Sequence, residues 1–453
     1  MDRSLPDSTS VFYRDPGHDY PLAVRGEGVY VYDANGKQYL DGSGGAAITC
    51  LGYCHPEVSD AIREQVGKLA FAHTVAFTNE PQEKLAARLA ARFSDSDISE
   101  PGARVYFVSG GSEANETAMK LVRQYWVARG RDDKHLMISR EQSYHGNTLG
   151  ALSLAGNPER SKVYAPLLQQ WPKIEPCYAY RHQRQDESDE AYGRRCAAAL
   201  ENAILEHGAE NIAAFFAEPV VGATMGAVPA VGPYFRKIRE ICDRHDILLV
   251  LDEVMAGWGR TGTWFAFEQE GVLPDMVTMA KGLGGGYQPI GAVIARGFIH
   301  DGIVEGSGSF PHGHTYVGHA TAAAAGVAVE RVIEQENLLE NVMKTGGVLR
   351  DALNEVFRDH PHVGDIRGRG LFLGIELVRD RETRAPIRAE LGLPETIRRT
   401  AMHHGLICYP GGGTADGRNG AHVLLAPPFI YKQSHVDELV SKLRRTFDDV
   451  SFL

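Results

Sequence analysis

The sequence lacks the features that mark disulfide-rich, metal-binding, ATP-binding or nucleic-acid-binding proteins. Its six cysteines are scattered over 453 residues without a CxxC pair, which predicts reduced thiols and no metal site. It has no Lys/Arg-rich block and a formal net charge of -11, which argues against a nucleic-acid partner. It also has no Walker A phosphate loop. These absences leave small-molecule chemistry as the main class of function.

Long apolar segments are missing as well. The first ten residues, MDRSLPDSTS, contain no apolar core of the kind that signal peptides have. The longest apolar stretches, such as 320–329, are alanine-rich and too short to cross a bilayer. We therefore expect a cytoplasmic protein with no membrane partner.

The sequence does contain an alternation of short apolar runs with amphipathic helical stretches. The runs span 105–108, 136–139, 212–217, 247–251, 276–280 and 290–294. Continuous apolar runs are typical of strands buried on both faces of a parallel sheet, and their alternation with helices is typical of βαβ units. The pattern predicts an α/β fold with a mostly parallel sheet flanked by helices.

The two ends of the chain predict a second, smaller α+β domain. A hairpin around Asn35 and Gly36 is expected near the start. A strand at 371–378 and a final helix at 434–450, with Ser434 and Asp437 as a capping box, are expected near the end. The segment 410–421, PGGGTADGRNGA, has the composition of a flexible loop. We therefore assign the small domain to residues 1–60 and 326–453, and the large domain to residues 61–325.

Three polar residues directly follow predicted strands. Glu218, Asp252 and Lys281 come after the runs at 212–217, 247–251 and 276–280. Ligands of open α/β sheets bind at the carboxyl ends of the strands, so these side chains are expected to converge. Two carboxylates beside a lysine suit a lysine Schiff base with an electron-sink cofactor. Taken singly, Lys281 could be an ordinary lysine on a glycine-rich turn, and Asp252 a helix cap.

Two weaker signals fit the same kind of site. Gly111 and Ser112 lie between a strand and a helix, where backbone N–H groups can bind a phosphate, although a plain capping turn would look the same. Tyr144 could stack on a planar cofactor, or it could be a partly buried core tyrosine. His145, next to it, is more often structural than catalytic when it is considered alone. Each signal alone has an ordinary structural explanation, but chance is a much poorer explanation for all of them occurring together in this order.

The motifs resemble those of the class III aminotransferases, which depend on pyridoxal 5'-phosphate and have PLP fold type I. LVLDEVMAGWGRTG followed by DMVTMAKGLGGG resembles the signature block of that family. VSGGSEANETAMK, SYHG, AEPV, HGHTYVGHA and IRGRGLFLGIEL resemble its other motifs, in the same order. The resemblance covers nearly the whole chain. It implies an omega-transaminase-like fold and a homodimer or a dimer of dimers with shared active sites.

The resemblance also implies roles for individual residues. The catalytic pair is Lys281, which forms the Schiff base and transfers protons, and Asp252, which pairs with the pyridine nitrogen. The implied cofactor-binding residues are Gly111, Ser112, Tyr144, Glu218, Asp252, Val254, Lys281 and Thr315. Of these, Val254 and Tyr144 would cover the two ring faces, and Thr315 would reach the phosphate of the neighbouring subunit.

Three positions depart from other members of the family. Met255 stands where ornithine- and 4-aminobutyrate-type members carry glutamine, and Leu424, four residues before Pro428, stands where they carry a carboxylate-binding arginine. Leu424 resembles the omega-transaminase (amine:pyruvate) branch, in which a mobile loop arginine binds the carboxylate. Arg418 is the candidate, although it could equally be a solvated loop residue. Small residues at 46–48 replace a bulky tryptophan of many omega-transaminases.

These observations predict an aminotransferase that works by a ping-pong mechanism. The donor is expected to be an amine or an omega-amino acid, and the acceptor a keto acid, preferably pyruvate. A 2-oxoglutarate-using omega-amino acid transaminase is an alternative, as is an aminomutase, racemase or decarboxylase of the same family. A non-enzymatic binding protein is a further alternative, but the presence of Lys281 and the lack of a DNA-binding module argue against it.

Overall fold

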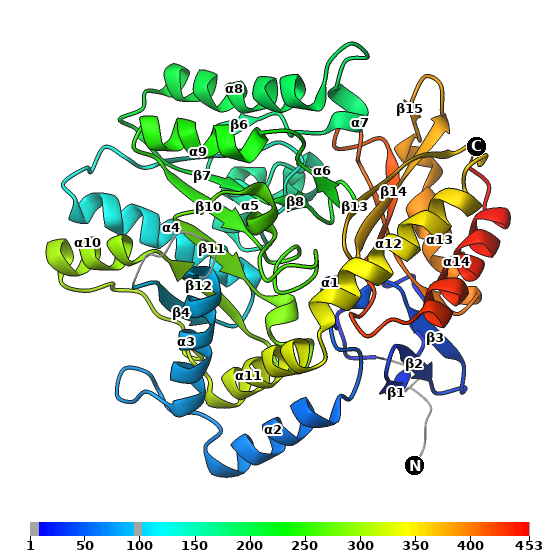
Figure 1. Cartoon of the computed structure of the whole chain (residues 1–453), viewed down its shortest axis with the longest axis horizontal. Coiled ribbons are helices and arrows are strands. Elements are labelled where there is room, and N and C mark those ends of the chain that lie inside the picture. The colour runs from blue at the N-terminus through cyan, green and yellow to red at the C-terminus, as the bar shows by residue number, and fades with distance from the viewer. Residues whose placement is uncertain (1–8, 95–101, 453) are drawn as a thin grey trace.

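The computed structural model describes residues 9–94 and 102–452 and is built around a seven-stranded sheet (Figure 1). The strand order is β4-β12-β11-β10-β7-β5-β6. The strands are β4 (Arg104–Val108), β5 (Leu136–Arg140), β6 (Lys173–Ile174), β7 (Ile212–Ala217), β10 (Leu248–Asp252), β11 (Met276–Met279) and β12 (Gly291–Ala295). The predicted α/β class and the mostly parallel sheet are confirmed.

One strand of this sheet runs against the others. β12 pairs antiparallel with both β11 and β4, whereas the pairs β11–β10, β10–β7, β7–β5 and β5–β6 are parallel. A parallel connection needs a crossover of a dozen or more residues, usually a helix. The segment between β11 and β12 contains only the short 3-10 turn η3 (Lys281–Leu283), so the chain turns back beside β11.

Helices cover both faces of the sheet because alternate strand residues point to opposite sides. Phe215 and Leu249 belong to one buried cluster, with residues of α3, α8, α9 and α11, whereas Phe216 and Val250 belong to another, with residues of α4 and α10. The helices of this part are α3 (Glu80–Ser94), α4 (Gly111–Ala128), α5 (Leu149–Leu154), α6 (Pro158–Ser161), α7 (Ala179–His182), α8 (Asp189–His207), α9 (Tyr234–Arg244), α10 (Gly297–Ser307) and α11 (Ala320–Gln335).

Both ends of the chain form the smaller sheets on the right of Figure 1. The first sheet contains β1 (Ala23–Glu27), β2 (Tyr30–Asp33), β3 (Gln38–Asp41) and β16 (Leu406–Ile407). The second sheet contains β13 (Val363–Arg369), β14 (Phe372–Asp380), β18 (Ala421–Leu425) and β17 (Tyr409–Gly412), and β15 (Ala385–Pro386) pairs with β14. β8 (Val220–Val221) and β9 (Val228–Pro229) form a separate hairpin. The remaining helices are α1 (Gly44–Ala47), α2 (Pro56–Lys68), α12 (Leu338–Val356), α13 (Leu393–His403) and α14 (Gln433–Asp448). The domain boundaries at residues 60 and 325 stay a prediction.

Two local predictions at the C-terminal end are wrong. Helix α14 begins at Gln433 and is capped by Lys432, so Ser434 lies inside the first turn and forms no capping box with Asp437. The start of the segment 410–421 is not a loop but part of β17, which pairs with β18. Glycine composition favours a loop, but the exposed backbone groups at the edge of β18 find partners in this strand. The hairpin near the start is confirmed by the antiparallel pair of β2 and β3.

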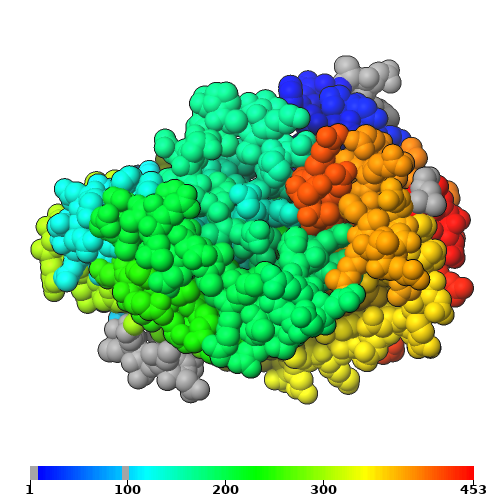
Figure 2. Space-filling view, turned by 90° about the horizontal axis from the view of Figure 1, so that it is seen from above, coloured from blue at the N-terminus to red at the C-terminus, as the bar shows by residue number. Residues whose placement is uncertain are grey.

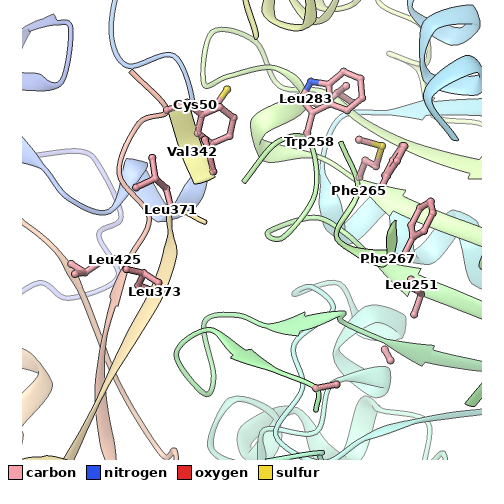
Figure 3. Packing of buried hydrophobic residues seen from close by; sticks show 14 of the residues in the cluster. Cys50, Leu251, Trp258, Phe265, Phe267, Leu283, Val342, Leu371, Leu373 and Leu425 are labelled. Carbon is pink, nitrogen blue, oxygen red and sulfur yellow. The ribbon is translucent and has the colours of Figure 1, made fainter. Parts of the chain in front are cut away.

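A single buried apolar cluster connects the large sheet with the smaller sheets. Figure 3 shows Trp258 and Leu283 on the side of the large sheet, and Leu371, Leu373 and Leu425 on the other side. This shared core holds the two parts together and fixes the position of β17 and β18 relative to the carboxyl edge of the large sheet. In the part of the chain that the structure describes, no helix is long and apolar enough to cross a membrane. The cytoplasmic location stays a prediction.

Candidate active site

Three neighbouring strands bring the predicted catalytic side chains to one edge of the sheet. Glu218 follows β7, Asp252 ends β10, and Lys281 lies two residues after β11. β7, β10 and β11 are adjacent and parallel, so their carboxyl ends lie together. The three side chains line one cavity of about 200 Å³. Its walls are formed by Gly111, Ser112, Tyr144, His145, Gly146, Glu218, Asp252, Val254, Met255 and Lys281.

Lys281 is held in an unusual backbone conformation and in a poorly solvated place. Its φ of 48° lies in the left-handed region, which costs a non-glycine residue about 1–2 kcal/mol. Burial lowers the pKa of the Lys281 amine to about 8, and the negative charges of Asp252 and Glu218 oppose this effect. About a tenth of the amine is therefore uncharged, and so nucleophilic, at pH 7, against less than about a thousandth for a solvated lysine.

Asp252 is oriented by donors from three different elements. Its Oδ2 accepts hydrogen bonds from Asn115 Nδ2 at 2.9 Å and from His145 Nδ1 at 2.9 Å, and its Oδ1 accepts one from the backbone N–H of Val254 at 3.0 Å. The side chain of Asn115 is fixed in turn by Thr278, whose hydroxyl donates to its Oδ1 at 3.2 Å. These bonds hold the carboxylate in one orientation at the cavity wall.

Glu218 connects two segments of the cavity wall. Its Oε1 accepts from the backbone N–H of Tyr144 at 3.1 Å, and its Oε2 accepts from the backbone N–H of Gly222 at 2.9 Å. Burial raises the pKa of this carboxyl, His145 opposes the shift, and the nearby charge of Asp252 adds to it. Glu218 therefore fixes the backbone that carries the Tyr144 ring.

Another part of the cavity wall is lined by Gly111 and Ser112, at the start of α4, and by Gly146. A Cβ on Gly111 would lie 2.9 Å from Val254 Cγ1, and a Cβ on Gly146 would lie 2.6 Å from Ser112 Oγ. Only glycine therefore keeps this space open. Ser112 Oγ accepts from the backbone N–H of Asn147 at 2.9 Å, so its hydroxyl hydrogen is available to a ligand. Backbone N–H groups at the start of a long helix suit a phosphate.

Thr315 and Arg418 lie outside this cavity. Thr315 is exposed on the turn before α11. Arg418 lies at the rim of a second cavity of about 390 Å³, and its guanidinium is paired with Glu390 at 2.6 Å. In Figure 2 the orange-red segment that includes residues 409–420 lies against the teal segment around residues 150–170, where this second cavity is found.

The structure adds three polar residues whose roles were not predicted from the sequence. His145 and Asn115 bind Asp252, and Arg160 lies over the Tyr144 ring, with 4.5 Å between Cζ and the ring centroid. His145 and Asn115 belong to the motifs SYHG and SEANETAMK, so a clue was present, but nothing in their spacing linked them to Asp252. Arg160 gave no signal, because its position depends on the packing of α6.

One cavity brings together a lysine with a lowered pKa, a fixed carboxylate, an aromatic ring and a glycine-lined anion cradle. These groups suit a phosphorylated cofactor that carries an aldehyde and a ring nitrogen. The comparisons with known proteins agree with this chemistry. The family model "Aminotransferase class-III" matches residues 13–447. The chain is 42% identical over 437 residues to an uncharacterized aminotransferase of Schizosaccharomyces pombe, covering 96% of this chain and 94% of that one.

It is 36% identical over 439 residues to a gamma aminobutyrate transaminase of Solanum lycopersicum, with 95% and 81% of the two chains covered. The fold is similar to that of an amine transaminase from an uncultivated Pseudomonas species in its PLP-bound form, with a TM-score of 0.90, 34% identity and coverage of 98% and 99%. It is also similar to the omega transaminase of Pseudomonas jessenii in complex with PMP, with a TM-score of 0.89, 34% identity and coverage of 97% and 96%.

The chain therefore belongs to the class-III aminotransferases, and it is a PLP-dependent transaminase of fold type I.

Proposed function

We propose that the protein transfers an amino group from an amine or an omega-amino acid to a keto acid, preferably pyruvate, by a ping-pong mechanism. The observation that carries this proposal is the single cavity shared by the Lys281 amine, the Asp252 carboxylate and the glycine cradle at Gly111. Pyridoxal phosphate, when bound, supplies an aldehyde that condenses with amines and a ring that stabilises negative charge on the adjoining carbon.

The residues of the cavity have distinct roles in this proposal. Lys281 Nζ would hold the cofactor covalently at rest, and once a substrate amine had displaced it, its uncharged form could accept and return a proton. The Asp252 carboxylate would pair with the ring nitrogen and keep it protonated. Tyr144 and Val254 would cover the two ring faces. Gly111 and Ser112 bind the phosphate with backbone N–H groups and a hydroxyl.

The residues next to the cofactor cavity are apolar and suit the apolar part of a substrate. Ala47, Ala223, Met255 and Leu424 belong to one buried apolar cluster, and Met255 also lines the cofactor cavity. Small alanines leave more room than large aromatic residues would. A thermostable omega transaminase of similar structure was engineered for the asymmetric synthesis of enantiopure bulky amines in a tryptophan-to-glycine variant. We infer that Ala46 and Ala47, in the segment 46–48, likewise leave room for the side group of a donor.

Arg418 is the proposed ligand for the carboxylate of the keto acid. Its exposed pair with Glu390 is of the kind that contributes at most about 1 kcal/mol, so little free energy opposes its release. A guanidinium can then bind a carboxylate with two parallel hydrogen bonds. When an apolar amine is bound instead, the arginine returns to Glu390.

The proposal includes a homodimer in which Thr315 reaches the phosphate of the neighbouring subunit. Two exposed apolar segments lie side by side next to Thr315, since the rings of Phe71 and Tyr316 are 5.7 Å apart. Val75 and Phe77 are 87% and 67% exposed in the isolated chain. Such exposed apolar groups are typical of an interface between subunits.

The experiment that tests the proposed reaction is a panel of amines and omega-amino acids against pyruvate and 2-oxoglutarate. Purified enzyme loaded with pyridoxal phosphate is mixed with one donor alone, and the absorbance is followed as the cofactor takes up the amino group. A stoichiometric spectral change that a keto acid reverses supports transamination. Turnover of a single substrate without a second one would instead indicate a racemase, an aminomutase or a decarboxylase.

A further inference from the structure

Three arginines line the second cavity, and two of them form ion pairs with glutamates. Arg418 is paired with Glu390, and Arg398 is paired with Glu395. Within the described residues, the guanidinium of Arg160 has no ion-pair partner, although it lines the same cavity of about 390 Å³. Arg160 is therefore the arginine of this cavity that has no ion pair among the described residues, although its side chain is exposed and Glu159 lines the same cavity.

Arg160 is held in position by two contacts. The buried Asn157 side chain accepts a hydrogen bond from the backbone N–H of Arg160 at 3.1 Å, which fixes the short helix α6. The guanidinium lies over the Tyr144 ring at 4.5 Å. A stacked guanidinium keeps its five N–H donors in the plane of the group, where they remain free to bind a carboxylate.

The contact between Arg160 and Tyr144 joins a residue that lines the second cavity to one that lines the cofactor cavity. Tyr144 lines the cofactor cavity with one part of its side chain and carries Arg160 on its ring. The positive charge of Arg160 is close enough to Lys281 to contribute to lowering the pKa of that amine, and it also acts on the buried His422 in β18. Arg160 is therefore next to the wall of the cofactor cavity that Tyr144 forms.

From this geometry we propose that Arg160 is a specificity-determining residue that binds the distal carboxylate of an omega-amino acid donor. The inference deepens the proposed function and rests on it. The donor class is thereby narrowed to short molecules with an amine at one end and a carboxylate at the other, and Arg418 is left to bind the carboxylate of the keto acid. The stacking on Tyr144 orients the guanidinium before the substrate arrives, which lowers the entropy lost on binding.

The test compares omega-amino acids with amines of the same carbon chain. Beta-alanine, 4-aminobutanoate and 5-aminopentanoate are paired with propylamine, butylamine and pentylamine in single half-reactions of the PLP-loaded enzyme. The variants are R160Q, which removes the charge, and R160K, which keeps the charge without the planar fork. R398Q is the matched control, because Arg398 lines the same cavity but is already bound to Glu395.

We expect R160Q to lower kcat/KM for the best omega-amino acid by about 10- to 100-fold, the range for losing hydrogen bonds to a charged group. R160K is expected to restore part of this loss. In R160Q, kcat/KM for the matching amine and for pyruvate in the second half-reaction should change by less than about threefold. In R398Q, kcat/KM for every substrate should change by less than about threefold. This split between substrates separates a binding role from a merely structural one.

Three other outcomes overturn the inference. An equal loss for amines and omega-amino acids would mean that Arg160 only supports Tyr144. No loss for either would mean that the carboxylate binds elsewhere, and a loss confined to pyruvate would make Arg160 the acceptor site. Failure of the proposed function itself is distinguishable, because the unmodified enzyme would then give no half-reaction with any donor.

Discussion

At the scale of single residues, the proposed chemistry depends on Lys281, whose amine is made reactive by its surroundings. Burial lowers its pKa to about 8, against about 10.4 for a solvated lysine. A protonated amine cannot attack an aldehyde, so capture of the cofactor is limited by the uncharged fraction. We expect the rate at which apoenzyme captures pyridoxal phosphate to rise with pH and to level off above about pH 8.

The measurement is stopped-flow absorbance across the pH range, with a small lysine analogue as the control. The analogue should continue to gain rate up to about pH 10, as an unperturbed amine does. A capture rate on the protein that follows the same curve as the analogue would show that the cavity does not perturb Lys281.

Two neighbouring glycines provide a second prediction at this scale. Gly111→Ala places a Cβ at 2.9 Å from Val254 Cγ1, within the cradle proposed for the phosphate. Overpacking of this kind costs about 1–3 kcal/mol, so we expect the Kd for pyridoxal phosphate to rise by about 10- to 100-fold. Gly110→Ala is the control, since its Cβ would meet nothing within 4 Å and its φ of -173° is extended.

Spectroscopic titration of both apoproteins with pyridoxal phosphate measures the two Kd values. Equal values for Gly111→Ala and the unmodified protein would place the phosphate elsewhere.

The sequence predicted the residues at the strand ends better than the residues that hold them. Lys281 and Asp252 were found because a polar side chain directly after a buried apolar run is conspicuous. Asn115 and His145 were not assigned to Asp252, because their contact depends on how α4 and the loop after β5 lie over the sheet. Local patterns carry no information on such long-range packing.

At the scale of elements, six strands of the large sheet were predicted to within a residue or two, since buried strands have continuous apolar runs, whereas the two-residue edge strand β6 was too short to give such a run. The direction of β12 and the strand β17 were not predicted. β17 forms because its backbone pairs with β18, a long-range contact that overrides its glycine-rich composition.

The contact between β14 of the smaller sheets and the loop at Gly226 provides a prediction about how the smaller sheets pack against the rest of the chain. A Cβ on Gly374 would lie 1.9 Å from the carbonyl oxygen of Gly226, so Gly374→Ala forces β14 away from that loop. We expect the midpoint of thermal unfolding to fall by about 1–3 degrees, because overpacking costs about 1–3 kcal/mol and the unfolding entropy of a chain of this length is about 1 kcal/mol per degree.

Gly412→Ala in the same sheet is the matched control, because its Cβ would meet no atom closer than 3.7 Å. Differential scanning calorimetry compares the two variants. Equal midpoints would mean that the junction between β14 and the loop is loose.

At the scale of the whole molecule, the exposed apolar face around Phe77 predicts a second copy of the chain. Phe77→Glu introduces a charge into the proposed interface, and a buried unpaired charge is strongly unfavourable. We expect the unmodified protein to sediment at twice the chain mass of 49.5 kDa or more, and the variant to sediment as a monomer. The variant should also bind pyridoxal phosphate more weakly, since Thr315 of the neighbouring subunit would be lost.

Leu205→Glu is the control, because Leu205 is similarly exposed, at 69%, but lies on α8, away from the segment that carries Phe77. Analytical ultracentrifugation of all three proteins measures the masses. A dimer that persists in Phe77→Glu would remove this face from the interface.

The most direct test of the account is the site of covalent attachment of the cofactor. Apoenzyme is incubated with pyridoxal phosphate, reduced with borohydride, digested and analysed by mass spectrometry. We expect one modified peptide, which contains Lys281. Lys134 serves as an internal control, because burial also lowers its pKa to about 8, but its amine is held by backbone carbonyl oxygens. The absence of an adduct, or an adduct on Lys134 or any other lysine in place of Lys281, would contradict the account.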